Sequence, residues 1–157
     1  MKTLKLSIIS ILFVSLLSSC GYNSMVEKDE TVTAQWANVE SQYQRRADLI
    51  PNLVSTVKGY AAHEKETLEA VINARSKATS TNIDASKLTP EAIQQFQQNQ
   101  SGLTSALSKL LVVVEKYPDL KANQNFLELQ AQLEGTENRI AVERSRFNEV
   151  VKDYNTY

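Results

Sequence analysis

Apolar residues recur along most of the chain at alternating steps of three and four positions, which places them on one face of an α-helix. The first such segment runs from Trp36 to Tyr60, and one charged residue, Arg46, shares its apolar face. Pro51 falls inside this segment, but the spacing continues through it without a change of phase. We therefore predict one long helix that bends near Pro51, with the alternative that the helix ends at Ile50 and Pro51 opens a new one.

Two further long segments show the same spacing, and a shorter segment with a weaker apolar stripe precedes them. The shorter segment follows a break at residues 59–63 and ends at a polar loop, residues 79–88. A Thr-Pro-Glu sequence at 89–91 provides the capping hydroxyl, the proline and the early acid that start a helix, and Pro118 ends the pattern that follows. Asn123 is the expected N-cap of the last helix.

Long helices with one apolar face must bury those faces against each other, and short connections make neighbouring helices antiparallel. The chain has only four Gly and three Pro, which favours long helices over many short strands. We expect an all-α, up-and-down antiparallel four-helix bundle with long first, third and fourth helices and a shorter second helix. Such a bundle has four helices at one end and three at the other, and the N-terminus lies at the thinner end.

Three polar residues interrupt the apolar faces at nearly one height in the expected bundle: Arg46, Gln100 and Glu143. A buried arginine needs a charged partner, because an isolated charge in a protein core is very costly. We predict that Glu143 pairs with Arg46 and that Gln100 hydrogen-bonds beside them, with Glu137 as the rival partner. This layer would fix the register of the helices. A binding role for Arg46, toward a lipid phosphate or a partner's acid, is the alternative.

The N-terminus has the features of a secretory leader. Lys2 and Lys5 precede an apolar run at residues 6–17, which is shorter than the roughly 20 residues of a membrane-spanning helix. The sequence Leu-Ser-Ser-Cys at 17–20 resembles the bacterial lipobox, in which the Cys is acylated and becomes the first residue of the mature protein.

Cys20 is the single cysteine of the chain and occupies the position that a lipobox requires. We therefore predict a lipoprotein signal peptide at residues 1–19, lipid attachment at Cys20 and a helical domain at residues 20–157. The alternatives are an uncleaved anchor helix and an incidental free thiol.

Charge and motifs narrow the classes of function. The formal net charge is −1, and no block of like charge indicates binding to nucleic acid. The one histidine, His63, lacks the two spacings of a helical metal site, because Tyr60 and not Glu lies three positions before it and Thr67 and not His lies four positions after it. No glycine-rich phosphate loop or nucleophile motif is present. We therefore expect no metal, no cofactor and no enzymatic activity, with a hydrolase that uses two carboxylates as an alternative.

Five motifs, spread over most of residues 22–157, carry a resemblance to a known family. They are Arg-Arg-Ala-Asp-Leu-Ile-Pro-Asn-Leu at 45–53, Val-Lys-Gly-Tyr-Ala at 57–61, Tyr-Pro-Asp-Leu-Lys-Ala-Asn at 117–123, Glu-Asn-Arg-Ile at 137–140 and Asp-Tyr-Asn at 153–155. Together they resemble the LemA family. The resemblance implies a helical bundle behind an N-terminal membrane anchor, without an established enzymatic activity. The resemblance implies a plain transmembrane helix as the anchor in most members of the family, so the lipobox of this chain is a departure from the family pattern.

These observations lead to one expected function and two alternatives. We expect a membrane-tethered, non-enzymatic interaction or scaffold protein of the bacterial cell envelope, with an envelope protein as its partner. The lipid anchor would hold the domain at the cell membrane or the outer membrane, on the exported side. The alternatives are a lipid-binding or membrane-shaping bundle and the carboxylate hydrolase.

The leader prediction can be tested with the substitution Cys20→Ser. Because the thiol is the group that is acylated, this variant should remain unprocessed or become soluble. Intact mass and membrane fractionation measure both properties. Recovery of the variant in membranes at the mature mass would show that Cys20 is not the attachment site.

Overall fold

The computed structural model describes the backbone of residues 19–81, 83 and 88–156, and the side chains of this part from Tyr22 onward. Residues 1–18 of the predicted leader at 1–19, and the side chain of Cys20, lie outside the described part. All regular secondary structure of the described residues is helical, which confirms the predicted all-α class. They form α2 (Ser19–Tyr60), α3 (Lys65–Ser80), α4 (Pro90–Val114), α5 (Pro118–Lys121) and α6 (Gln124–Asn155).

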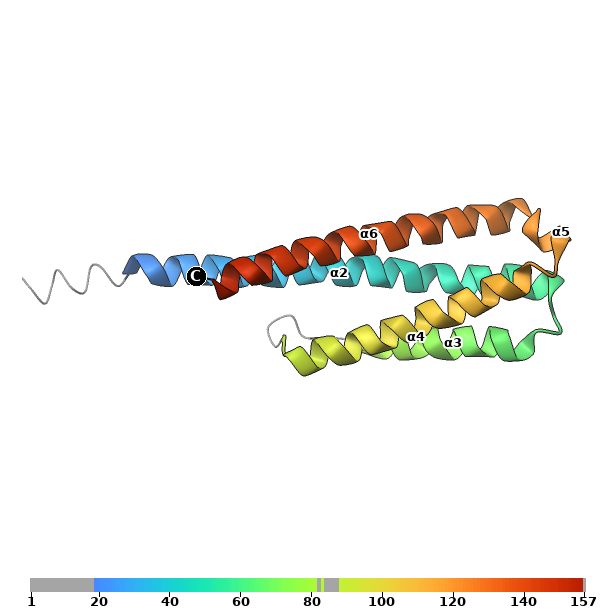
Figure 1. Cartoon of the computed structure of the whole chain (residues 1–157), viewed down its shortest axis with the longest axis horizontal. Helices are drawn as coiled ribbons and strands as arrows, with labels where there is room; N and C mark the ends of the chain where they lie inside the picture. Colours follow the sequence, from blue (N-terminus) through green and yellow to red (C-terminus); the bar gives the residue numbers. More distant parts are fainter. Residues whose placement is uncertain (1–18, 82, 84–87, 157) are drawn as a thin grey trace, which may run out of the picture.

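The long helices lie as two antiparallel pairs, α2 with α6 and α3 with α4 (Figure 1). Backbone contact is extensive within each pair and between α2 and α3, but at most marginal between α4 and α6. A salt bridge from Lys28 to Asp153 joins the last turn of α6 to the N-terminal part of α2. The seam between α4 and α6 is therefore the loosely packed side of the structure.

The four long helices together form a rod, and its thin end is the end at which the N-terminal part of α2 lies. This end differs from the prediction. Figure 1 shows α2 and α6 extending past the free end of the α3–α4 pair, so two helices lie at this end instead of the expected three. The cause is length: α2 has 42 residues and α4 has 25. At about 1.5 Å per residue these helices span about 63 Å and about 38 Å, so α4 ends well short of the N-terminal part of α2.

Both predicted N-caps are confirmed. The Thr89 side chain accepts a hydrogen bond from the Ala92 amide at 3.2 Å, and the Asn123 side chain accepts one from the Phe126 amide at 3.0 Å. Pro118 was expected only to end the third helix. Instead it is the first residue of the one-turn helix α5, since proline suits a first helical turn as well as it prevents the continuation of a helix.

The buried apolar residues form two clusters along the rod. The distal cluster lies toward the α5 end and contains Ile50, Leu53, Val57, Ala61, Leu68, Val71, Ala78, Leu103, Ala106, Leu110, Val114, Leu120, Phe126 and Leu129. The proximal cluster lies toward the thin end and contains Trp36, Val39, Tyr43, Ile83, Phe96, Ile140 and Phe147. The polar residues between these clusters form the site described below.

Helix α2 continues through Pro51, so the alternative of a helix end at Ile50 is wrong. Proline has no amide hydrogen, and therefore Pro51 leaves the carbonyl of Ala47 without its usual helical partner. The structure provides a replacement from another helix: Arg75 Nε of α3 donates to the Ala47 carbonyl at 2.8 Å. Because Ala47 is buried, this hydrogen bond removes the cost of a buried, unsatisfied acceptor.

None of the helices in the part of the chain that the structure describes combines the length and the apolar character needed to cross a bilayer.

The role of Arg75 can be tested in two backgrounds. Arg75→Leu should lower the free energy of unfolding by about 1–3 kcal/mol, because the Ala47 carbonyl loses its donor. In a Pro51→Ala background the amide of residue 51 can make the normal helical hydrogen bond, so the same substitution should cost clearly less. Urea denaturation measures both losses. Lys77→Leu, at an exposed position of α3, is the control, and equal losses from Arg75→Leu in both backgrounds would contradict the assignment.

Candidate functional site: the groove between α4 and α6

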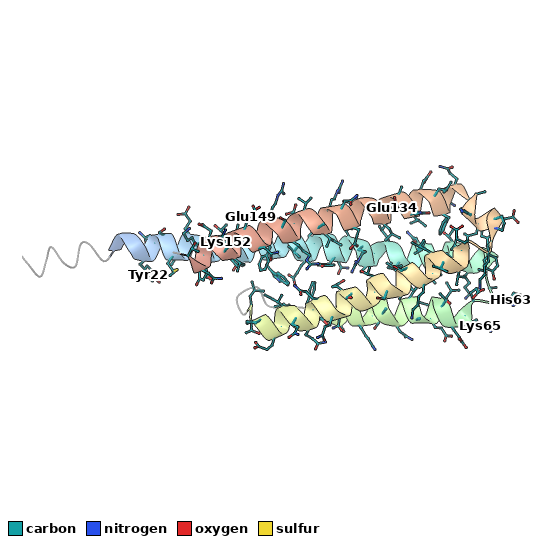
Figure 2. The ribbon with its side chains drawn as sticks, in the orientation of Figure 1. Tyr22, His63, Lys65, Glu134, Glu149 and Lys152 are labelled. Carbon is teal, nitrogen blue, oxygen red and sulfur yellow. The ribbon has the colours of Figure 1, made fainter. Side chains whose placement is uncertain are left out.

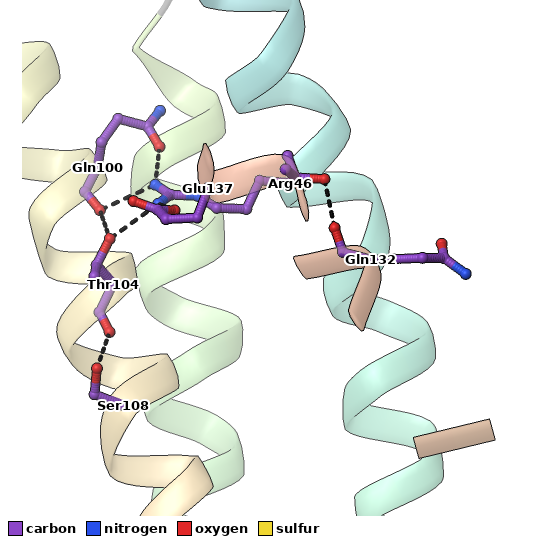
Figure 3. A network of polar contacts seen from close by, with 7 residues as sticks. Arg46, Gln100, Thr104, Ser108, Gln132 and Glu137 are labelled. Carbon is purple, nitrogen blue, oxygen red and sulfur yellow. Dashed lines mark hydrogen bonds and ion pairs between the residues drawn. The ribbon is translucent and has the colours of Figure 1, made fainter. Parts of the chain in front are cut away.

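Arg46 is the buried cation of the structure, and its guanidinium has four acceptors (Figure 3). One terminal nitrogen donates to Thr104 Oγ1 at 2.9 Å and to Glu137 Oε2 at 2.8 Å. The other donates to the backbone carbonyl of Gln100 at 3.1 Å and to its side-chain oxygen at 2.8 Å. The central guanidinium carbon of Arg46, Cζ, also lies 5.1 Å from the ring centroid of Tyr43. The side chain therefore links α2 to both α4 and α6.

This polar layer separates the two apolar clusters. The buried polar residues Arg46, Gln100 and Thr136 each lie between the distal and proximal core residues of their own helix. The side-chain nitrogen of Gln100 donates to the carbonyl of Ala78 at 3.2 Å, near the end of α3. All four long helices therefore meet in this layer.

The structure brings Arg46 and Gln100 together but places Glu143 elsewhere, so the expected Arg46–Glu143 pair is corrected. The carboxylate partner is Glu137, the rival considered above. Glu143 instead accepts from Gln35 Nε2 at 2.7 Å and pairs with Arg146 at 2.9 Å.

The reason is the register of α6 against α2. The side-chain nitrogen of Asn123 donates to the Tyr60 hydroxyl at 2.9 Å, so these two residues lie at one level. Arg46 lies 14 residues before Tyr60 and Glu137 lies 14 residues after Asn123. The carboxylate level with Arg46 is therefore Glu137, whereas Glu143 lies six residues farther along α6, more than one and a half turns away.

A groove follows the open seam between α4 and α6, and α2 forms its floor. Its outer hollow, at the thin end, has a volume of about 580 Å³ and is lined mainly by apolar side chains, among them Val32, Leu88, Ile93, Phe147 and Val151. Its inner hollow has a volume of about 230 Å³ and is lined by polar residues, among them Arg46, Gln100, Thr104, Glu137 and Arg144. A small hollow of about 20 Å³ lies between them: Phe147 lines it together with the outer hollow, Arg144 lines it together with the inner hollow, and Gln97 lines all three.

Aromatic rings form the floor and wall of this groove. Trp36 lies 5.3 Å from Phe96 and 5.1 Å from Phe147, measured between ring centroids. Tyr43 lies 5.0 Å from Phe96 in an edge-to-face arrangement. Edge-to-face rings interact through their quadrupoles in addition to burying apolar area. The floor of the groove is therefore a packed part of the core and is formed before any ligand binds.

The inner hollow carries more positive than negative charge. Arg46 and Arg144 line it together with one carboxylate, Glu137, whose side chain is 53% exposed. Burial raises the pKa of the Tyr43 phenol, and the nearby Arg144 and Arg46 guanidinium groups oppose that rise. Arg144 lies beside the Tyr43 phenol, whose pKa it lowers, and no carboxylate of the described residues lies within ion-pair distance of Arg144. This end of the groove suits an anionic group.

A second set of motif residues connects the turns at the opposite end of the rod. The Tyr117 hydroxyl donates to Glu64 at 3.0 Å, and this hydrogen bond raises the pKa of the Tyr117 phenol because it stabilises the protonated form. Figure 2 shows His63 near Lys65 at this end, far from Tyr22. Within the described residues no group of three potential ligands could hold a metal ion. The hydrogen bond between Tyr117 and Glu64 joins the α2–α3 turn to the turn around α5.

Sequence reasoning missed Arg144, Gln97 and the apolar residues of the outer hollow as parts of one site. Arg144 follows Glu137 by seven positions, which places both on the same face of α6, and this spacing was available in the sequence. The separation of α4 from α6 has no comparable signal, because it depends on how the two helix pairs pack. The predicted lipid site, Cys20, remains a prediction, since its side chain is outside the described part.

The fold and the groove define a class: an all-α rod of long antiparallel helices with a groove along one seam. The profile of the LemA family matches residues 35–157, which include Arg46, Glu137 and Arg144. This chain therefore belongs to the LemA family.

Three curated proteins show the range of its relatives. The chain is similar to the magnetosome protein MamQ of Magnetospirillum gryphiswaldense, at 26% identity over 97% of this chain and 62% of that protein. It is 26% identical to the magnetosome protein MamQ 2 of Paramagnetospirillum magneticum, over 85% of this chain and 56% of that protein. It is 24% identical to protein LemA of Metamycoplasma hominis, over 85% of this chain and 58% of that protein. The chain thus spans about three fifths of the length of these relatives.

The corrected pairing predicts the outcome of two single substitutions. Glu137→Ala should lower the free energy of unfolding by about 1–3 kcal/mol, because Arg46 then keeps only neutral acceptors. Glu143→Ala, the control, should cost less than about 1 kcal/mol, because its ion pair is with the exposed Arg146. Thermal and urea unfolding measure both. A larger loss from Glu143→Ala than from Glu137→Ala would show that the assignment of the partner is wrong.

Proposed function

We propose that this protein is a membrane-tethered, non-enzymatic interaction module of the bacterial cell envelope that binds a partner protein in the groove between α4 and α6. In this proposal the four long helices act as an up-and-down bundle with one open seam. The observation that carries the proposal is the groove itself: an apolar hollow and a polar hollow joined over a packed aromatic floor. Binding grooves of this kind combine apolar area with a few polar groups that fix orientation.

The position of the groove agrees with a lipid anchor at Cys20. Asp29, nine residues after Cys20 on α2, lines the outer hollow. At about 1.5 Å per residue this hollow lies about 14 Å from the proposed attachment site. A protein anchored in this way would present the groove just above the membrane surface, on the exported side, where membrane-bound envelope proteins can reach it.

The groove supports binding better than hydrolysis. A hydrolase with two acids needs its carboxyl groups about 5–10 Å apart around one bond. Among the described residues, the carboxylates that line the groove are Asp29 and Glu137, which lie in different hollows, and Glu137 is held by Arg46.

A membrane-shaping role is the second candidate, because apolar side chains are exposed at the thin end. Tyr22 is 73% exposed, and Met25 and Val26 on the same helix are also exposed. Tyrosine and apolar side chains next to a lipid anchor suit the depth of the lipid headgroups. Liposome binding that survives Cys20→Ser and is lost when Met25 and Val26 are changed to Ser would favour this role.

The interaction role can be tested by crosslinking in living cells. A photoreactive amino acid at Gln94, an exposed position that lines the outer hollow, should crosslink to one reproducible envelope protein. The same amino acid at Lys77, on an exposed face of α3, should not give that product. Mass spectrometry identifies the partner. Absence of a specific product from Gln94, or the same product from Lys77, would contradict a binding role for the groove.

A further inference from the structure

We infer that the groove between α4 and α6 binds an amphipathic helix of another protein, with apolar side chains in the outer hollow and a carboxylate on Arg144. This inference rests on the proposed function and specifies the chemistry of the partner. It commits to a helix with an acidic group, rather than a lipid or a second copy of the chain, for the three reasons that follow.

The first reason is shape. The groove runs along α4 from Pro90, which lines the outer hollow, to Thr104, which lines the inner hollow. This length is about 21 Å at 1.5 Å per residue, or about four helical turns. The walls are two long helices and the floor is a third. A helix laid in this space would pack as one more member of the bundle, which is the common helix-in-groove mode of recognition.

The second reason is charge complementarity. Arg144 is an exposed residue that lines the inner hollow, and the polar group that the described part of the structure places beside it is the neutral Tyr43 hydroxyl. Arg46 adds positive charge behind it, and Glu137 offsets only one of the two cations. A carboxylate from a partner would gain a charge-assisted hydrogen bond there, whereas a lysine would be repelled.

The third reason is polarity along the groove. Asp29 lines the outer hollow, whereas two arginines and one glutamate line the inner hollow, so the two ends of the groove carry opposite charge. An acyl chain would fill the outer hollow without using Arg144, but a helix can use both ends at once. Opposite charges at the two ends also select one direction for the bound helix.

The spacing of the two hollows sets the sequence pattern of the partner. Val151 in the outer hollow and Arg144 in the inner hollow are seven residues apart on α6, which is about 10 Å along the helix. Two positions seven residues apart on a partner helix have the same separation and lie on the same face. The partner therefore carries an acidic residue seven positions from an apolar anchor.

A displayed library of helical peptides tests this pattern directly. The peptides hold a fixed apolar anchor, and the position seven residues away is randomised. They are selected on the full chain in detergent micelles. We expect enrichment of Asp and Glu at that position. Selection on an Arg144→Glu variant should instead enrich Lys and Arg, because the charge of the inner hollow is reversed.

Binding constants of the selected acidic peptides give the quantitative test. Arg144→Glu should weaken binding by about tenfold or more, which corresponds to about 1.4 kcal/mol, and Arg144→Gln should give an intermediate loss. Arg146→Glu, an exposed arginine two positions along α6 that pairs with Glu143, is the matched control and should change binding by less than about twofold. Circular dichroism and unfolding curves establish that each variant is folded.

Two results would overturn the inference. One is selection of peptides without a charge preference at that position, and the other is a preference that Arg144→Glu does not change. If the crosslink from Gln94 still identifies an envelope protein in that case, the proposed function stands and only the partner chemistry is wrong. If neither experiment gives a specific product, the groove is not a protein-binding site.

Discussion

The pairing of the buried Arg46 guanidinium is the constraint on which the rest of the structure depends. A cation in the core must be matched by acceptors, because an unpaired charge there is very unfavourable. The acceptors come from two helices that make little backbone contact with each other, Gln100 and Thr104 on α4 and Glu137 on α6. One side chain therefore sets the positions of α4 and α6 relative to α2. Long apolar stripes could otherwise slide past one another by a turn or a heptad.

The same arrangement explains why a groove exists. Arg46 is long enough to bridge from α2 to both neighbours, so α4 and α6 are held at this level without packing closely against each other. Between this layer and the thin end, the aromatic rings of the proximal cluster pack against α2 and form the floor of the groove. The space between α4 and α6 over this floor stays open. A site built in this way is largely preorganised, because its floor belongs to the core and its charged end is held by hydrogen bonds.

Two further sets of hydrogen bonds connect the helices: one satisfies a backbone carbonyl of α2, and the other joins the turns at one end of the rod. Arg75 of α3 replaces the hydrogen bond that Pro51 removes from α2, and in doing so it joins α3 to α2. At the opposite end of the rod, Tyr60 with Asn123 and Tyr117 with Glu64 connect the two turns. These contacts determine which residue of α6 lies level with Arg46. The family motifs thus coincide with the places where helices are aligned.

The sequence by itself determined the four long helices, two of their caps and most of the residues that face the core. Thr89, Asn123, Arg46 and Gln100 could be assigned because capping chemistry and the helical repeat are local properties, which a chain expresses within one or two turns. Only the tertiary structure decided three features: Glu137 and not Glu143 pairs with Arg46, Arg75 donates to the Ala47 carbonyl, and α4 and α6 leave a groove between them. Each of these depends on the register and distance between helices. Register is set by turn geometry and by the reach of single side chains, and the six residues between Glu137 and Glu143 amount to more than one and a half helical turns.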